Sequence, residues 1–315
     1  KHAEKDTNIE SMARSWYQKN SQDYKKILAV SIIAGDIVKL GKWISDAKDT
    51  VSKDNPIKLN GPDGIKYSPE PLGTSGEIAF IFPGSGNHYV GMGRSIGVVW
   101  PEILRKMDEE TLQLKTQLIP QCYIPWGNIW ENGWEKNAHN KIISNPLHMI
   151  FGQVAHGGVI SNLVRSFSIK PSAVIGYSLG ESAGLFALEA WPERGNMLER
   201  MKASNLFHTE LTGPCNAARK VWKIPPDEDV EWYVAAVNRS AKTVKKAIKK
   251  IPAAHLLIVN TPEECVIGGR KKQVRAAIKI LGCEYVPIEG VVTVHCDAAV
   301  PAKEAYKDLH LFPTT

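Results

Sequence analysis

The chain has 315 residues, a length that predicts roughly two domains and is enough to bury a sizeable core. Apolar residues make up 43% and charged residues 23%, which excludes collagen-like, low-complexity and wholly disordered proteins. Lysine and arginine exceed aspartate and glutamate by 39 to 33, a net charge of +6. Such a small excess indicates nucleic-acid binding only if it gathers on one face, and we expect no nucleic-acid partner.

The cysteines and the apolar runs narrow the class further. Cys122, Cys215, Cys265, Cys283 and Cys296 are odd in number and include no Cys-x-x-Cys pair. This pattern argues against a disulfide framework and a zinc cluster, so we expect no metal and a reducing cytoplasm. No apolar run approaches the roughly eighteen residues that span a bilayer, so no membrane partner is expected.

The first 75 residues are predicted to form a small accessory region. A polar stretch precedes a short strand at 26–31 and a helix at 37–47, where apolar residues have helical spacing. Residues 50–76 are rich in proline and glycine and poor in apolar clusters, which predicts a loop or linker. We therefore expect a boundary near residue 75.

The next part of the chain alternates strands with helices. Residues 77–82 form a buried-strand pattern that ends at a glycine-rich turn, and 172–177 form a second short apolar strand. Residues 145–164 are apolar enough for a core helix, and the small residues of 181–190 predict another. This alternation predicts an α/β layer with a mostly parallel sheet.

A more regular pattern follows in residues 213–288. Strands are expected at 230–237, 255–260, 264–267 and 284–288, and helices at 241–250 and 271–281. The order is β-α-β-β-α-β, which is typical of a ferredoxin-like subdomain. We expect it to be inserted in, or appended to, the α/β core.

The pattern Gly-x-Ser-x-Gly occurs twice, around Ser95 and around Ser178. A nucleophilic serine in this pattern needs a strand before it and a helix after it, because the sharp turn between them lifts the hydroxyl out of the sheet. Ser178 has both, whereas Ser95 follows a loop. We therefore predict that Ser178 is a nucleophile, with a structural turn serine as the alternative, and that Ser95 caps a helix.

A serine nucleophile needs a base within hydrogen-bond reach. His295 follows an apolar run at 291–294 that predicts a strand, and a residue at a strand end is well placed to face a cleft. We predict that His295 is this base, with a buried structural histidine as the alternative. The spacing along the chain does not show that the two residues meet.

Three stretches in this order resemble the landmarks of the malonyl-CoA:acyl-carrier-protein acyltransferase family. They are FPGSGNHYVGMG at 82–93, GYSLGE at 176–181, and Val294-His295. The sequences of the two glycine-rich stretches are most similar to those in acyltransferase domains of polyunsaturated fatty acid synthases and iterative type I polyketide synthases. The resemblance implies an α/β-hydrolase-like core at 76–212 and 289–315 and a ferredoxin-like subdomain at 213–288. It also implies that residues 1–75 are a linker that follows a ketosynthase.

The resemblance further implies a mechanism. Ser178 would attack an acyl-CoA thioester, with malonyl-CoA the expected donor, and His295 would accept its proton. The phosphopantetheine thiol of an acyl carrier protein would then take the acyl group, and no cofactor would stay bound. The backbone N–H groups of Ser85 and Leu179 would bind the oxyanion, each worth about 3 kcal/mol of transition-state stabilisation. Most of the family has glutamine at the Ser85 position, but a backbone donor survives that change.

The expected substrate-binding residues are Gly84, Gly86, His88, Arg200 and Ser204. Malonyl-selective members place an arginine about 25 residues after the serine to pair with the free carboxylate. Here Ala203 or Ser204 occupies that position, so Arg200, one helical turn earlier, is the candidate substitute; a solvated helix arginine is the alternative. The run before His295 matches neither selectivity pattern of polyketide acyltransferases, which leaves the acyl group open.

Basic residues gather on the two expected helices of the ferredoxin-like subdomain. They are Lys242, Lys245, Lys246, Lys249, Lys250, Arg270, Lys271, Lys272 and Arg275. A solvated helix face is one interpretation, and a docking surface for an acidic carrier protein or for CoA phosphates is the other.

Two rival functions stay open on the residues alone. Water could release the acyl group from the same serine, which would make the chain a thioesterase, or the chain could be a non-catalytic domain of a synthase. The chain begins at Lys1, and the family's fold continues past the base histidine. We therefore expect a piece of a multidomain synthase that lacks the closing segment, with the synthase's ketosynthase and other domains as partners.

Overall fold

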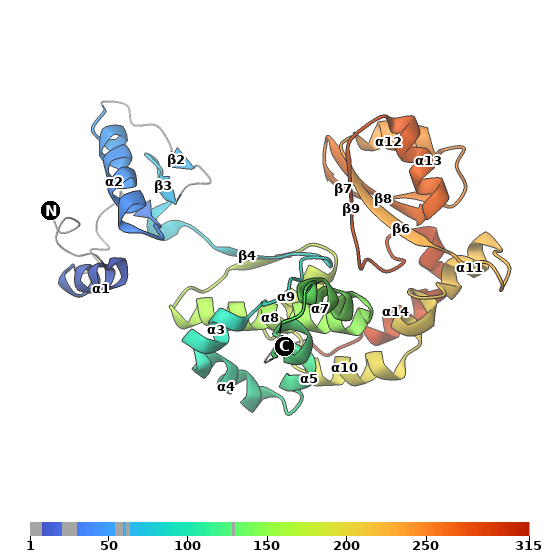
Figure 1. Cartoon of the computed structure of the whole chain (residues 1–315), viewed down its shortest axis with the longest axis horizontal. Helices are drawn as coiled ribbons and strands as arrows, with labels where there is room; N and C mark the ends of the chain where they lie inside the picture. Colours follow the sequence, from blue (N-terminus) through green and yellow to red (C-terminus); the bar gives the residue numbers. More distant parts are fainter. Residues whose placement is uncertain (1–7, 21–29, 54–58, 61–63, 128–129, 315) are drawn as a thin grey trace. The chain divides into compact units, whose positions relative to one another are not determined.

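The computed structural model describes residues 8–20, 30–53, 59–60, 64–127 and 130–314. The chain divides into two compact units, Lys1–Glu77 and Ile78–Thr315 (Figure 1). Each unit is described by itself below.

The first unit combines two helices with a small sheet. Helix α1 (Ile9–Lys19) is capped by the Asn8 side chain, which accepts hydrogen bonds from two N–H groups of its first turn. Helix α2 (Ile37–Val51) is capped in the same way by Asp36. In each helix, the capping side chain therefore accepts from one or more backbone N–H groups of the first turn that have no partner within the helix.

The sheet of this unit corrects one prediction. Strands β1 (Val30–Ile32), β3 (Ile65–Tyr67) and β2 (Leu59–Asn60) pair antiparallel in the order β1-β3-β2, and η1 (Gly73–Ser75) follows. The loop or linker expected at 50–76 therefore contains two short strands and a 3-10 turn that the sequence pattern did not indicate. The alternate residues Ile65 and Tyr67 are buried, which is enough to hold a three-residue strand against β1. Of the strand expected at 26–31, residues 26–29 lie outside the described residues.

The second unit begins with the parallel pair that carries the site. Strand β4 (Ala79–Phe82) pairs in parallel with β5 (Ala173–Gly176), so both strands end at the same edge. Helix α8 (Pro146–Ser166) crosses between them in sequence, and α9 (Leu179–Ala187) leaves β5 and packs on α8. The α/β fold class predicted from the sequence is confirmed.

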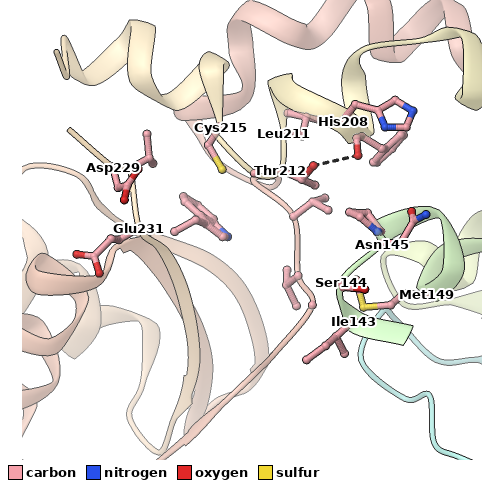
Figure 2. Close-up of a pocket in the computed structure, with 18 residues that line it drawn as sticks. Ile143, Ser144, Asn145, Met149, His208, Leu211, Thr212, Cys215, Asp229 and Glu231 are labelled. Carbon is pink, nitrogen blue, oxygen red and sulfur yellow. Dashed lines mark hydrogen bonds between the residues drawn. The ribbon is translucent and has the colours of Figure 1, made fainter. Parts of the chain in front are cut away.

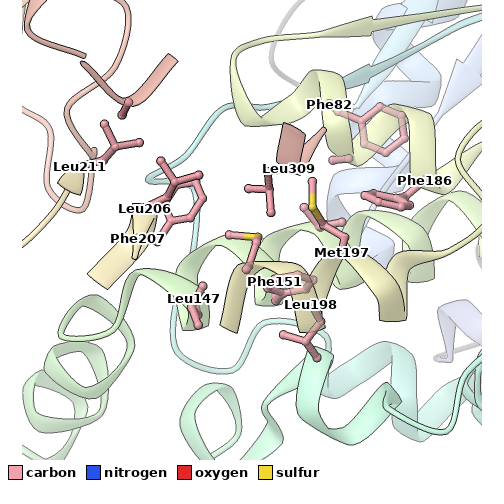
Figure 3. Close-up of a cluster of buried hydrophobic side chains, with 14 of the residues drawn as sticks. Phe82, Leu147, Phe151, Phe186, Met197, Leu198, Leu206, Phe207, Leu211 and Leu309 are labelled. Carbon is pink, nitrogen blue, oxygen red and sulfur yellow. The ribbon is translucent and has the colours of Figure 1, made fainter. Parts of the chain in front are cut away.

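The second unit contains further helices. They are α3 (Arg94–Val99), α4 (Pro101–Glu110), α5 (Leu114–Leu118), α6 (Pro120–Tyr123), α7 (Trp134–Ile143), α10 (Arg194–Ala203), the π-helical η2 (Leu206–Glu210), α11 (Asn216–Trp222), η3 (Asp297–Ala302) and α14 (Lys303–Leu309). The largest hydrophobic core brings α8, α9, α10, η2 and α14 together (Figure 3). Phe82, Phe151, Phe186, Met197 and Leu309 are among its buried side chains.

A four-stranded antiparallel sheet occupies the later part of this unit. Strands β6 (Trp232–Val237), β7 (Ala254–Thr261), β8 (Glu264–Arg270) and β9 (Tyr285–Pro287) lie in the order β7-β8-β6-β9. Helices α12 (Ala241–Ile248) and α13 (Lys271–Leu281) lie side by side against it and bury Val244, Val274 and Ala277 (Figure 1). The element order is β-α-β-β-α-β. The domain boundaries at residues 213 and 288, and the linker role of 1–75, stay predictions.

The strand expected at 291–294 does not form. In the described part of the chain no strand lies beside this segment to pair with it, and instead the Thr293 N–H donates to the carbonyl of Leu211 at 2.8 Å. Thr293 is fully buried, and Val292 and Val294 pack against the main core. Core packing, rather than a sheet, therefore fixes the segment that leads to His295. Among the described helices, none is long and apolar enough to cross a bilayer.

Candidate active site

Ser178 occupies a tight turn at the edge where β4 and β5 end. Its backbone has φ 52° and ψ −116°, a conformation that non-glycine residues rarely adopt. Two hydrogen bonds fix the turn: the Tyr177 N–H donates to Phe82 O at 3.0 Å, and the Gly180 N–H donates to Tyr177 O at 2.9 Å. Strain held in place by its surroundings is typical of functional sites. The predicted strand, serine and helix order is present around Ser178.

The two glycines of this motif are required by close backbone contacts. A Cβ on Gly176 would lie 2.2 Å from the Glu181 nitrogen, and a Cβ on Gly180 would lie 2.1 Å from the carbonyl oxygen of Phe82.

The second copy of the motif, around Ser95, lies in a different structural setting. Ser95 lies inside α3, and Gly93 occupies the N-cap position, so the predicted capping role of Ser95 was wrong. The helix begins at Arg94, two residues before the start that an N-cap at Ser95 would give.

His295 meets Ser178 across 117 residues of sequence. The distance from Ser178 Oγ to His295 Nε2 is 2.8 Å, a good hydrogen bond. Partial desolvation lowers the pKa of His295, and the negative charge of Glu181 acts in the opposite direction. A lowered pKa keeps the imidazole neutral near pH 7 and able to accept a proton. Among the described residues, none forms a hydrogen bond with His295 Nδ1, whereas Nε2 is bonded to Ser178.

A cavity of about 750 Å³ opens beside this pair. Ser85, Ser178, Leu179 and His295 all line it, so the structure brings these four predicted residues together. The rest of the lining is mainly apolar and includes Ile150, Phe151, Val154, Leu185, Phe186, Trp191, Met197, Met201, Phe207, Leu211, Val291, Val292 and Val294. A mainly apolar cavity with a few convergent polar groups is the usual form of a small-molecule site.

Ser85 and Leu179 both line the cavity that contains Ser178. Leu179 is the first residue of α9, so its N–H has no acceptor within the helix. In the described part of the chain, neither N–H donates to a protein acceptor. Two backbone donors without a protein acceptor in the lining of one cavity are suited to an anionic oxygen.

Gln153 holds the loop that carries Ser85. Its Nε2 donates to the carbonyl oxygens of Pro83, at 2.9 Å, and Gly84, at 2.5 Å. Sequence reasoning missed this residue, although a buried glutamine in the middle of the apolar helix α8 is itself a signal, because a buried amide needs partners.

Gly84 and Gly86 shape the same loop without lining the cavity. Gly84 lies against the Tyr177 ring, and Gly86 has φ 97°, a conformation that favours glycine. Both predicted positions therefore act on the loop's backbone in this structure. Their expected contact with substrate stays a prediction.

His88 does not line the cavity that contains Ser178. It is buried, and its ring stacks on His139 with 5.2 Å between the ring centroids. Burial and the neighbouring imidazole both lower the pKa of His88, so it stays neutral. The His88 ring therefore lies toward α7, and its expected contact with substrate stays a prediction.

Arg200 and Ser204 also lie outside this cavity's lining. Arg200 Nη1 donates to the carbonyl of Leu311 at 2.8 Å, and its guanidinium lies 4.4 Å from the centre of the Phe312 ring. Ser204 Oγ accepts a hydrogen bond from the Leu206 N–H at 3.1 Å, at the end of α10. Both side chains make local contacts in this structure, and their predicted roles at the acyl group stay predictions.

Besides Ser182, four polar side chains of the cavity were not predicted. Glu181, Lys303, Tyr306 and His310 line it, and the Tyr306 and His310 rings stack with centroids 4.3 Å apart. Lys303 is the one lysine or arginine in the described lining. Three of the four belong to the last helical segment, whose path depends on tertiary packing. The described residues contain no cluster of three or more His, Cys, Asp or Glu side chains placed to hold a metal ion.

A second cavity, of about 760 Å³, adjoins the first (Figure 2). The two cavities share four lining residues, Phe207, Leu211, Val291 and Val292, which lie between them. Figure 2 shows Asp229 and Glu231 on one side of the second cavity and the residues of the α7–α8 turn on the other. Ser178 is not part of its lining.

The sequence is similar to known acyl-transferring proteins. The chain is 23% identical over 241 residues to the malonyl CoA-acyl carrier protein transacylase of Bacillus subtilis, which covers 74% of this chain and 67% of that protein. It is 24% identical over 268 residues to non-reducing polyketide synthase 1 of Elsinoe fawcettii, covering 84% of this chain. That match spans 10% of the synthase, so the chain corresponds to about a tenth of such proteins. No family model matches the chain.

Solved structures give the same result. The acyltransferase domain from the second module of the salinomycin polyketide synthase covers 98% of this chain and 69% of its own, with a TM-score of 0.59 and 14% identity. A malonyl-transacylase solved with its type II polyketide synthase acyl-carrier protein covers 76% of this chain and 72% of its own, with a TM-score of 0.55 and 17% identity.

The chain has the acyltransferase fold. The predicted resemblance to malonyl-CoA:acyl-carrier-protein transacylases and polyketide synthase acyltransferases is confirmed. In this acyltransferase fold, Ser178 and His295 come from two segments that both end at the cavity described above.

Proposed function

We propose that this chain is an acyltransferase that moves a malonyl group from CoA to the phosphopantetheine thiol of an acyl carrier protein. The observation that carries the proposal is the 2.8 Å contact between Ser178 Oγ and His295 Nε2 beside a cavity of about 750 Å³. The similarity to a malonyl CoA-acyl carrier protein transacylase supports the donor and the acceptor. The sequences of the two glycine-rich motifs support the proposal that the chain belongs to a polyunsaturated fatty acid or polyketide synthase, together with a ketosynthase and other domains.

The reaction proceeds in two steps through an acyl-serine. Neutral His295 accepts the Ser178 proton as Oγ attacks the thioester carbonyl, and the imidazolium returns that proton to the departing CoA sulfur. The carrier thiol then gives its proton to His295 and attacks the ester, and Ser178 Oγ leaves with that proton. The N–H groups of Leu179 and Ser85 stabilise the negative oxygen in both steps, at about 3 kcal/mol each.

The lining of the cavity supports a place for the malonyl carboxylate. An anion buried among apolar side chains needs a cation beside it. Lys303 is the one lysine or arginine in the described lining, whereas Arg200 is held by backbone carbonyls elsewhere. We therefore assign Lys303, rather than Arg200, as the first candidate to pair with the carboxylate.

Intact mass spectrometry after brief exposure to malonyl-, acetyl- and longer acyl-CoAs tests the proposal. We expect a malonyl adduct on the wild-type protein, none on Ser178→Ala, and an unchanged adduct on Ser95→Ala, which alters the other serine of the same motif. Absence of an adduct with every thioester would refute the proposal and indicate a non-catalytic domain. An adduct that water releases as fast with as without carrier protein would indicate a thioesterase instead.

A further inference from the structure

Tyr177, the residue before Ser178, contacts three segments that lie far apart in sequence. Its backbone belongs to the nucleophile turn, where its N–H donates to Phe82 O at 3.0 Å. The residue is about 40% exposed and does not line the cavity beside Ser178. The ring and the hydroxyl are used for contacts with two other segments.

The Tyr177 ring lies directly against the loop that carries Ser85. A Cβ on Gly84 would be 2.5 Å from Cδ1 of the ring and 3.0 Å from the Tyr177 carbonyl oxygen. The loop can approach this closely only because residue 84 has no side chain. Movement of the ring would therefore move the Ser85 N–H as well.

The hydroxyl of Tyr177 reaches the β7–β8 hairpin. Its oxygen is 2.7 Å from Oδ1 of Asn260, to which it donates, and Asn260 Nδ2 donates to Glu264 Oε1, also at 2.7 Å. The strand register shifts between Val259 and Thr261, so Asn260 lies at an irregularity of the ladder. Such bulges commonly redirect a side chain toward a functional site.

The Tyr177 phenol has the protonation state that its hydrogen bond to Asn260 requires. Partial burial and the negative charge of Glu264 raise the pKa of Tyr177, while the hydrogen bond to Asn260 acts in the opposite direction. The phenol therefore keeps its proton at neutral pH and remains a donor.

We propose that Tyr177 is a positioning residue that couples the β7–β8 hairpin to Ser178 and to the Ser85 loop through its hydrogen bond with Asn260. This inference rests on the proposed acyl transfer. Removal of the hydroxyl leaves the ring and the turn in place but frees the hairpin from both catalytic segments. One hydrogen bond of this kind corresponds to about a three- to tenfold effect on kcat/KM.

Four variants test the coupling. Tyr177→Phe and Asn260→Ala each remove one partner, and the double variant removes both. Asn260→Asp combined with Glu264→Gln reverses donor and acceptor between positions 260 and 264 and still offers an acceptor to Tyr177. Tyr89→Phe, at another exposed tyrosine of the glycine-rich segment, is the matched control.

We expect each single variant to lower kcat/KM for malonyl loading about three- to tenfold with an unchanged melting temperature. The double variant should lose no more than a single variant, and the reversed pair should stay close to wild type. Hydrogen exchange should rise in both 83–86 and 259–264 in Tyr177→Phe but not in Tyr89→Phe. Wild-type loading in both single variants, or fully additive losses, would overturn the coupling.

The exchange measurement separates this inference from the proposed function. If the wild-type protein forms no acyl-enzyme, the proposed function fails. Exchange that rises in both segments of Tyr177→Phe would still support the structural coupling, and unchanged exchange would overturn it. Asn260→Ala keeps the test valid if Tyr177→Phe does not fold, because Asn260 is exposed at the end of β7.

Discussion

Replacing Gly180 with alanine should displace the turn that holds Ser178. The added Cβ would lie 2.1 Å from the carbonyl oxygen of Phe82, 2.7 Å from its carbon and 3.0 Å from the oxygen of Pro83. All three are backbone atoms, so rotation of a side chain gives no relief. Bringing the shortest distance to 3.0 Å requires a shift of about 0.9 Å.

A shift of this size should be visible in both activity and stability. Misplacement of a reacting group by about 1 Å costs about 10²-fold in rate, and overpacking of a close contact costs about 1–3 kcal/mol of unfolding free energy. Gly195→Ala is the matched control, because its nearest neighbours would be 3.5 and 3.9 Å from the new Cβ. Urea unfolding and the rate of adduct formation measure the two effects. A Gly180→Ala protein with control-like stability and a loading rate within about twofold of wild type would refute the steric account of the motif.

Three further predictions concern the charged groups. Because His295 must be neutral to accept a proton and its pKa is lowered, the malonyl loading rate should rise with pH to a plateau with its midpoint below 6.5; a midpoint above 6.5 would contradict the assignment. Arg200→Ala should change malonyl and acetyl loading by the same factor, because Arg200 contacts Leu311 and Phe312 rather than the cavity; a loss confined to malonyl would oppose this. The double variant Lys245→Glu with Lys246→Glu on α12 should raise KM for carrier protein more than KM for malonyl-CoA. The control pair, Lys106→Glu with Lys115→Glu on α4 and α5, should not have this effect. Equal effects of the two pairs would argue against docking of the carrier at α12.

Local patterns in the sequence were sufficient for the elements that carry the nucleophile. Apolar runs gave β4 and β5 to within a few residues, and the helix-forming run after Ser178 gave α9. The glycines of the motif follow from the same local geometry, because the contacts they permit lie within a few residues or on the adjacent strand. Periodicity likewise gave α13 at its observed bounds.

Side-chain placement that depends on packing between distant segments was not predictable. His295 was assigned for its position after an apolar run, yet the run packs on the core through Val292 and Val294 instead of forming a strand. Arg200 looked available on a helix, but the last residues of the chain fold back over it. Lys303, Tyr306 and His310 reach the cavity for the same reason, and no local pattern marks them.

The most direct test of the account is a single-turnover chase of the acyl-enzyme. Protein loaded with malonyl-CoA and freed of excess donor is mixed with phosphopantetheinylated carrier protein, and both proteins are followed by intact mass. The account predicts that malonyl leaves Ser178 and appears on the carrier thiol in equal amount, faster than water removes it without carrier. Malonyl that never forms on Ser178, or that leaves only as free malonate, would contradict acyl transfer by this chain.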